Sequence, residues 1–246
     1  MGVGGDARGH LVKHSAHSLL VVMSKEPVAG KVKTRLQPEL SPAQAADLYR
    51  CFLQDRLEEM TGLEDVDTAV AYDPPSAAKN FASFVPDSFR IFPQQGEGLS
   101  ERLDIIFSDA FDEGYGTVSI VDSDSPDLPR AFVLESFRLL KKEADIVFGP
   151  CRDGGYYLVG MNARRGGVFD GIPWSSSGVL HKSIERAQLL GLRVSLLPAW
   201  QDIDTFDDLR DFYSRRSHAG TSPSTPGSRT LALLAGKKFA FTRGDG

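Results

Sequence analysis

Short apolar segments alternate with helical segments along most of this chain of 246 residues. The apolar runs that we expect to form strands are residues 19–23, 66–72, 89–92, 117–121, 145–148, 156–161 and 193–197. Apolar residues recur at helical spacing between them, which predicts helices at residues 41–62, 75–84, 100–111, 130–143, 179–190 and 206–215. Repeated β-α-β alternation with short apolar strands predicts an α/β fold, in which a mostly parallel sheet carries helices on both faces.

We expect one domain between two tails. Residues 1–17 are rich in Gly and His, lack periodicity, and are predicted to be a disordered N-terminal extension. Residues 18–216 contain the alternating pattern and form the predicted domain. Residues 217–246 begin with a linker rich in Ser, Thr, Pro and Gly, and continue into a weakly apolar stretch whose structure the pattern does not assign.

The composition argues against several classes of protein. The chain has 28 Lys and Arg against 33 Asp and Glu, a formal net charge of −5, whereas dedicated nucleic-acid binders are usually basic. No apolar run approaches the roughly 18 residues of a membrane span, and residues 19–23 are too few for a signal-peptide core. The two cysteines, Cys51 and Cys151, make no disulfide framework. We therefore expect a cytoplasmic protein without a nucleic-acid partner or a membrane span, and leave its oligomeric state open.

Ligands of parallel sheets bind beyond the carboxyl ends of the strands, so the loops that follow strands are the candidate sites. The first such loop, residues 24–36, gathers four cations around one glycine: Lys25, Gly30, Lys31, Lys33 and Arg35. A turn that brings cations and free backbone N–H groups together suits a polyphosphate, although a solvated basic loop has the same composition. A P-loop is excluded, because Lys25 replaces its first glycine and Val32 replaces its Ser or Thr.

A D-x-D pair follows the expected strand at 117–121. Asp122 and Asp124 stand two residues apart and can aim both carboxylates at one point, which suits Mg²⁺ or Mn²⁺ and the phosphates that such an ion carries. A polar turn is the simpler interpretation, and a phosphatase that forms an aspartyl phosphate is a second, although its motif usually lies on the first strand. Asp127 precedes the next expected helix and is predicted to cap it.

A second D-x-D pair, Asp202 and Asp204, follows the last expected strand and repeats this spacing. Thr205 and Asp208 form an expected capping box for the helix that comes next. Asp202 and Asp204 therefore remain available for a metal ion.

A glycine-rich turn lies between the two acidic loops. Asp153 is followed by Gly154 and Gly155, which permit positive φ and a close approach of the backbone to a ligand. A tight turn into the next strand explains the glycines but not the neighbouring charges.

Two D-x-D pairs together with one cationic loop indicate chemistry at phosphorus. A divalent ion held by carboxylates bridges phosphate oxygens, while Lys and Arg side chains neutralise the remaining charge. Catalysis by histidine is disfavoured, because the only histidine outside the tails is His181, which lies in an expected helix.

Five motifs in order also resemble those of a known family. They are KEPVAGKVKTRL, DSDSPDLP, GPCRDGGYYLVG, IPWSSSGVL and DIDTFDDL. Over about residues 18–212 the chain resembles the GT-A-fold nucleotide-diphospho-sugar transferases, and more closely their radical-SAM/selenodomain-associated branch. It is also similar to the guanylyltransferases for molybdenum cofactor and for 2-phospholactate. The resemblance implies a three-layer α/β/α sandwich with a mixed sheet of about seven strands.

The resemblance also implies roles for individual residues. Residues 25–35 match the loop that binds nucleotide phosphates, Asp124 matches a metal ligand, and Asp202 or Asp204 matches the second carboxylate. The turn Asp153, Gly154 and Gly155 matches a loop on the acceptor side. Glycine commonly stands where this chain has Asp122, so Asp122 is an additional candidate ligand beside Asp124.

The leading hypothesis is nucleotidyl transfer from a nucleoside triphosphate to a small phosphorylated or hydroxyl acceptor, with release of pyrophosphate. The candidate catalytic residues are Lys31, Lys33, Arg35, Asp124 and Asp153. Glycosyl transfer from a nucleotide-diphospho-sugar is the alternative, and the cationic loop favours the former because a triphosphate needs more countercharge. A nucleotide-binding regulatory protein without catalysis is a hypothesis of another class. The sequence pattern does not encode the base or the acceptor.

Overall fold

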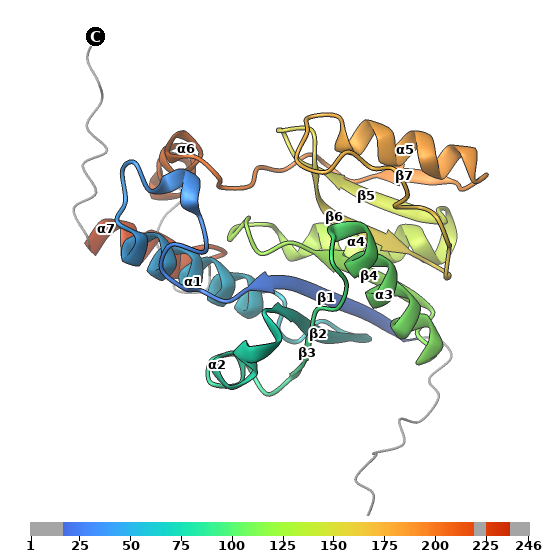
Figure 1. Ribbon diagram of the computed structural model, residues 1–246, viewed down its shortest axis with the longest axis horizontal. Helices are drawn as coiled ribbons and strands as arrows, with labels where there is room; N and C mark the ends of the chain where they lie inside the picture. The colour runs from blue at the N-terminus through green and yellow to red at the C-terminus, as the bar shows by residue number, and fades with distance from the viewer. Residues whose placement is uncertain (1–16, 219–224, 237–246) are drawn as a thin grey trace, which may run out of the picture.

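Seven strands form one sheet in the computed structural model, which describes residues 17–218 and 225–236 (Figure 1). In chain order they are β1 (Ser18–Lys25), β2 (Val66–Asp73), β3 (Phe89–Pro93), β4 (Thr117–Val121), β5 (Ile146–Pro150), β6 (Tyr156–Met161) and β7 (Val194–Leu196). The order across the sheet is β3-β2-β1-β4-β6-β5-β7, and only β6 runs antiparallel to its neighbours, β4 and β5. The predicted α/β fold with a mostly parallel, mixed sheet is confirmed.

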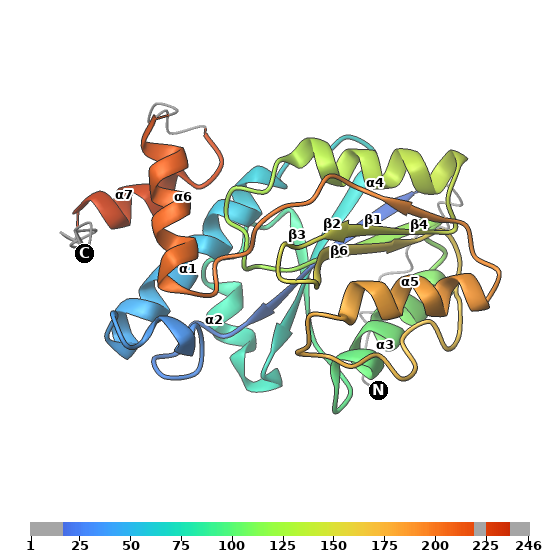
Figure 2. The ribbon, with the colours of Figure 1, turned by 90° about the horizontal axis from the view of Figure 1, so that it is seen from above.

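Helices cover both faces of this sheet (Figure 2). Those of the described residues are α1 (Pro42–Glu59), α2 (Ala78–Ala82), α3 (Leu99–Asp112), α4 (Arg130–Lys142), α5 (Val179–Leu189), α6 (Phe206–His218) and α7 (Ser228–Gly236), with 3₁₀ turns η1 (Thr34–Leu36) and η2 (Pro75–Ala77). Leu20 and Val22 of β1 belong to a core shared with α1, α2, α4 and α6, whereas Leu19 and Val21 belong to a core shared with α3 and α5. Successive side chains of a strand point to opposite faces, so β1 is buried on both. None of the described helices is long and apolar enough to cross a membrane.

Helix α1 begins with a capping box. The hydroxyl of Ser41 accepts from the backbone N–H of Gln44 at 3.2 Å, and the side chain of Gln44 accepts from the N–H of Ser41 at 2.8 Å. This reciprocal pair satisfies two N–H groups that have no partner within the helix. Ser100 stands at the start of the helix expected at 100–111 and is the cap that the sequence suggests, but the N-cap of α3 is Gly98. The hydroxyl of Ser100 donates to the carbonyl of Phe169 at 2.7 Å instead.

The C-terminal part of the described chain folds against α1. Figure 2 shows α6 and α7 beside α1, beyond one end of the sheet. The buried carboxylate of Asp55 accepts from the backbone N–H groups of Arg229 and Thr230, both at 2.9 Å, which fixes the start of α7. The apolar stretch that the sequence pattern left unassigned thus contains a helix. Most of the expected N-terminal extension and parts of the expected C-terminal tail, residues 1–16, 219–224 and 237–246, lie outside the described residues.

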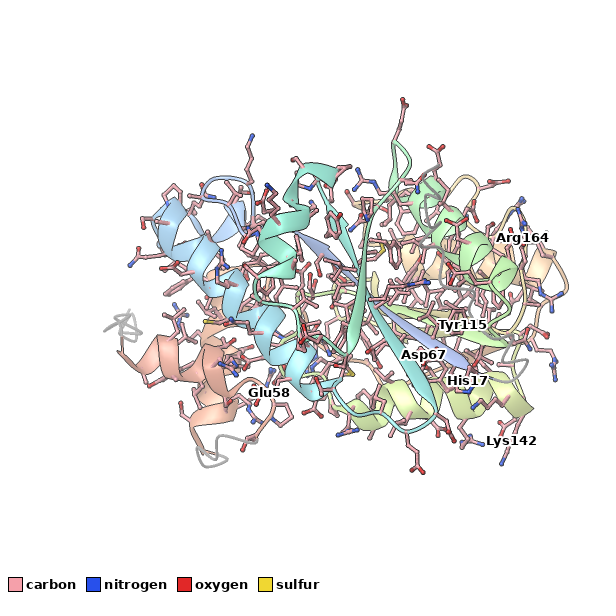
Figure 3. The ribbon with its side chains drawn as sticks, turned by 90° about the horizontal axis from the view of Figure 1, so that it is seen from below. His17, Glu58, Asp67, Tyr115, Lys142 and Arg164 are labelled. Atoms are coloured by element: carbon pink, nitrogen blue, oxygen red, sulfur yellow. The ribbon has the colours of Figure 1, made fainter. Side chains whose placement is uncertain are left out.

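A hydrogen bond between surface side chains joins two elements near the amino ends of the strands. The hydroxyl of Tyr115, which follows α3, donates to Asp67 of β2 at 3.0 Å (Figure 3). The loops with candidate site residues lie at the opposite edge, beyond the carboxyl ends of β1 and β4.

Candidate functional site

A cavity of about 560 Å³ opens at the carboxyl ends of β1 and β4. Its walls come from residues 31–35, from residues 94–103, from Asp122 and Asp124, and from Asp204. The volume lies within the roughly 300–1,000 Å³ that is usual for small-molecule sites, and the edge of the sheet is the one where α/β proteins bind ligands.

Three cations of the first loop are exposed at this cavity. Lys25, Lys31 and Arg35 all line it, and the side chain of Arg35 is 71% exposed. Gly30 has φ +78°, a left-handed conformation that glycine adopts without strain and that turns the loop here. These residues present positive charge to the cavity, as the sequence led us to expect.

Lys33 behaves differently, because its ammonium group is buried between the two acidic loops. Its side chain is 4% exposed, and Nζ lies 2.7 Å from Asp124 Oδ1 and 2.9 Å from Asp204 Oδ1. The carbonyl oxygen of Ile203 is a third acceptor, at 2.6 Å. Burial by itself would lower the pKa of Lys33, but the two carboxylates outweigh it and raise this pKa above its ordinary value. An ammonium group has three protons, and all three have protein acceptors here.

The two acidic loops are joined to each other. The N–H of Ile203 donates to the carbonyl of Asp124 at 3.0 Å, next to the bridge that Lys33 makes. Asp127 does not cap α4 as expected, because Pro129 is the N-cap. Its buried carboxylate instead accepts from Trp200 Nε1 at 3.2 Å and pairs with Arg215 at 3.4 Å. Asp127 therefore links the first acidic loop to Trp200, which precedes the second acidic loop, and to Arg215 of α6.

The second acidic loop leads into α6 through the predicted capping box. Thr205 Oγ1 accepts from the N–H of Asp208 at 3.3 Å, and the carboxylate of Asp208 accepts from the N–H of Thr205 at 2.8 Å. Asp204 pairs with Lys33, so Asp202 is the carboxylate of this loop that has no ion pair among the described residues.

The carboxylates of the two acidic loops, Asp122, Asp124, Asp202 and Asp204, are called the acidic cluster. Two of them have a raised pKa. Burial, and then repulsion from Asp124, raise the pKa of Asp122 to about 8. Burial, and then repulsion from Asp204 and Asp153, raise the pKa of Asp202 to about 6. Both shifts favour the neutral carboxyl group, because burial and the neighbouring carboxylates each disfavour its negative charge.

The two acidic loops offer donors that suit a divalent ion. Asp122, Asp124 and Asp202 have hard carboxylate oxygens, which Mg²⁺ and Mn²⁺ prefer, and an ion would relieve the repulsion that raises the pKa of Asp122. Asp204 is the weaker candidate, because both of its oxygens are paired with cations, Lys33 at 2.9 Å and Arg35 at 3.4 Å.

The raised pKa values predict how the stability of the metal-free protein depends on pH. Between about pH 4 and pH 8 the unfolded chain loses the Asp122 proton while the folded protein keeps it, so stability falls as pH rises; Asp202 adds to the fall up to about pH 6. We expect a lower Tm at about pH 8 than at about pH 5.5 in a chelator, and a smaller difference in Asp122→Asn. Thermal unfolding at both pH values measures it. A Tm in chelator that rises over this range would contradict the pKa assignments.

The glycine turn is fixed by α5 rather than by the cavity. Gly154 has φ +92°, and a Cβ built on it would lie 2.0 Å from the carbonyl oxygen of Ser177, which leads into α5. The side chain of Asp153 accepts from the N–H of Gly155 at 2.8 Å. None of these three turn residues is among the described residues that line the cavity. The ligand atoms of Cys151, Asp153 and Asp202 lie within 4.8 Å of one another, so Asp153 borders the acidic cluster from outside.

Sequence reasoning missed a polar network on the far wall of the cavity. Gln94 follows β3 and donates to the carbonyls of Ser24 at 3.0 Å and Ala71 at 2.8 Å. Its carbonyl accepts from Arg102 of α3 at 3.1 Å, and Arg102 pairs with Asp73 at 3.3 Å. The available signal was a polar residue shortly after an expected strand, since Gln94 follows residues 89–92 with one proline between them. The network fixes the ends of β1 and β2 beside the cationic loop.

Comparisons with known proteins agree with the fold. Residues 56–176 match the family described as an uncharacterized protein conserved in bacteria (DUF2064). A solved structure from Desulfovibrio desulfuricans G20, described as a candidate nucleotide-diphospho-sugar transferase, has 35% sequence identity and a TM-score of 0.82, and the match covers 90% of this chain and 95% of that one. None of the curated proteins compared with the sequence matches it.

More distant structures show the same fold at low identity. A CMP:2-keto-3-deoxy-manno-octonic acid synthetase solved with CTP has 13% identity and a TM-score of 0.53, covering 83% of this chain and 100% of that one. A cytidylyltransferase from Leptospira borgpetersenii has 10% identity and a TM-score of 0.50, covering 91% and 95%. Similarity at this level concerns the arrangement of strands and helices.

Proposed function

Because this chain belongs to the family of nucleotide-diphospho-sugar-transferase-like proteins that includes the Desulfovibrio desulfuricans protein, we propose that it is a metal-dependent nucleotidyltransferase. It transfers a nucleotidyl group from a nucleoside triphosphate to a small phosphorylated or hydroxyl acceptor and releases pyrophosphate. The observation that carries the proposal is the placement of three exposed cations, Lys25, Lys31 and Arg35, at the same cavity as the acidic cluster. Such a site can hold a triphosphate between positive side chains and a carboxylate-bound ion.

The cationic loop receives the leaving group. In the proposed reaction an acceptor oxygen forms a bond to the α-phosphorus, and the bond from that phosphorus to the oxygen of the departing pyrophosphate breaks. Lys31 and Arg35, with Lys25, neutralise the charge that develops on pyrophosphate. Lys33 acts at a distance, because its protons are directed at Asp124, Asp204 and a carbonyl.

The acidic side of the cavity would hold the metal, and the turn beside it would receive the acceptor. Asp122, Asp124 and Asp202 would hold Mg²⁺ or Mn²⁺, which supplies positive charge to phosphate oxygens when it is bound. Asp153 is exposed beside Asp202 and is the proposed contact for the acceptor. When the acceptor is a hydroxyl, Asp153 takes its proton; a phosphate acceptor has none to give up at neutral pH.

The five motifs extend the proposal to a branch of the family. Their order and their coverage of residues 18–212 support membership of the radical-SAM/selenodomain-associated transferases. The two cysteines, Cys51 and Cys151, make no disulfide framework, which supports a cytoplasmic location for the reaction.

Glycosyl transfer is the second candidate, and the description of the Desulfovibrio desulfuricans relative favours it. Titration calorimetry with nucleoside triphosphates and with nucleotide-diphospho-sugars, each with Mg²⁺, separates the two reactions. Triphosphate binding, with pyrophosphate release in the presence of an acceptor pool, supports the proposal. Tight binding of a nucleotide-sugar without any triphosphate binding contradicts it. Binding with no turnover in a broad acceptor pool favours a regulatory protein instead.

Removing the exposed cations should weaken triphosphate binding. We expect Lys31→Ala and Arg35→Ala each to lower the affinity about 10-fold or more, because a hydrogen bond to a charged group contributes about 1.5–3 kcal/mol. Calorimetry with the triphosphate that the wild type binds measures the loss. Lys182→Ala is the matched control, since Lys182 is an exposed lysine on α5 whose partner is Glu185. Unchanged affinity in both loop variants would place the phosphates elsewhere.

A further inference from the structure

A fully buried arginine lies beneath the first acidic loop. Arg56 of α1 has 0% exposure, and its guanidinium donates to the carbonyl oxygen of Ser125 and, at 3.5 Å, to that of Leu128. Its Nη2 also lies 3.9 Å from Asp122 Oδ1. The loop that contains both carboxylates of the first D-x-D pair is therefore attached to α1 through one side chain.

The hydrogen bonds that attach the loop to α1 do not by themselves require a charged side chain. Two carbonyl oxygens can be satisfied by a neutral donor, whereas a buried guanidinium is costly unless it is paired. Asp122, Asp124 and Asp127 all act on Arg56 as nearby negative charges. Of the cations in the described residues, Arg56 and Lys33 are those buried against the acidic cluster, and they meet different carboxylates: Arg56 lies near Asp122, and Lys33 pairs with Asp124 and Asp204.

A second residue of α1 supports the same loops from the same face of the helix. Tyr49 precedes Arg56 by seven residues, which is two helical turns. Its hydroxyl accepts from the N–H of Lys25 at 3.0 Å and shares a hydrogen bond of 2.7 Å with Ser123. Helix α1 thus contacts the cationic loop and the acidic loop with two side chains.

We propose that Arg56 is a positioning residue of the metal site, whose buried charge and hydrogen bonds hold Asp122 and Asp124 in the arrangement that binds a divalent cation. The inference deepens the proposed function, and rests on it for the presence of a cation at these carboxylates. It is independent of the acceptor and of whether a nucleotidyl or a glycosyl group is transferred.

The test is a titration of the full chain with Mn²⁺ in the absence of nucleotide. Electron paramagnetic resonance measures the Mn²⁺ that remains free. Arg56→Gln keeps hydrogen-bond donors and removes the charge, and we expect it to bind Mn²⁺ about 10- to 100-fold more weakly, the range for residues that support metal ligands. Arg56→Lys keeps the charge but loses the fork of donors, so we expect it to bind Mn²⁺ more tightly than Arg56→Gln, a partial rescue that a merely structural role does not predict.

Ser41→Ala is the matched control for stability, because it removes the cap at the opposite end of the same helix from Arg56. It should lower Tm and leave Mn²⁺ affinity unchanged. Wild-type affinity in a folded Arg56→Gln would overturn the proposal. If Arg56→Gln does not fold, the Mn²⁺ affinity of Arg56→Lys tests the proposal. An affinity as low as that of Asp124→Asn would overturn the proposal, and a higher affinity supports it.

Failure of the proposed function has a different signature. A protein that binds Mn²⁺ through Asp124 but transfers no nucleotidyl group leaves the role of Arg56 standing. A wild type without any Mn²⁺ binding overturns both.

Discussion

Asp124→Asn is expected to lower turnover roughly 10²- to 10³-fold, the range for removing one group that is preorganised to stabilise developing charge. Asp124 lies at the cavity, at the end of β4, where it meets the second acidic loop. An amide has the shape of a carboxylate but lacks its charge, so it is a poor ligand for Mg²⁺ or Mn²⁺. Pyrophosphate release with the substrates of the wild type measures the loss.

The same substitution should leave the fold intact. Lys33 Nζ lies 2.7 Å from Asp124 Oδ1, and the amide oxygen of Asn can accept that hydrogen bond. Repulsion of Asp122 also decreases when the neighbouring charge is removed, which offsets part of the lost ion pair. Far-ultraviolet circular dichroism and Tm check this expectation.

Asp207→Asn is the matched control for Asp124→Asn. Asp207 lies on α6, three residues after Asp204, and its carboxylate pairs with Arg210 on the exposed surface of the helix. Turnover of the control should be that of the wild type. Turnover of Asp124→Asn within about threefold of wild type would remove Asp124 from the metal site, and with it the central assignment of the proposed function.

The elements of the fold could be predicted because their signals are local. The strand expected at 117–121 is β4, Thr117–Val121, and the helix expected at 179–190 is α5, Val179–Leu189. The direction of β6 could not be predicted, because an apolar run such as 156–161 has the same pattern in parallel and antiparallel strands. Its pairing with β4 and β5 depends on contacts between distant segments.

The site could be predicted by residue type but not by pairing. Lys33 was predicted to be one cation among four in its loop, yet its partner Asp204 is 171 residues away, and no local pattern reports such a contact. The sequence pattern of α1 does indicate that Arg56 is buried. Apolar residues of α1 recur at Tyr49, Phe52, Leu53 and Met60, and position 56 lies on the same face, where a charge indicates a buried partner.

Lys33→Met should destabilise the metal-free protein and increase its response to Mn²⁺. Removing one partner of a buried pair costs about 3–5 kcal/mol. The side chains of Asp124 and Asp204 are 38% and 35% exposed, so solvent screens part of the repulsion, and we expect a loss nearer about 2 kcal/mol. Chemical unfolding in a chelator measures it, and Lys31→Met, in the exposed part of the same loop, should change stability by less than about 0.5 kcal/mol.

Mn²⁺ should restore more stability to Lys33→Met than it adds to the wild type, because the ammonium group occupies carboxylate oxygens that a divalent ion can use. This sign is opposite to the one expected for Arg56, which contacts the loop from beneath and leaves those oxygens free. If Lys33 instead bound phosphate directly, Lys33→Met would keep wild-type stability and lose triphosphate affinity. Unfolding curves with and without Mn²⁺, combined with triphosphate titration, separate these two roles. If Lys33 joins the two acidic loops, its loss changes the unfolding curves. If Lys33 receives a phosphate, its loss changes the triphosphate affinity.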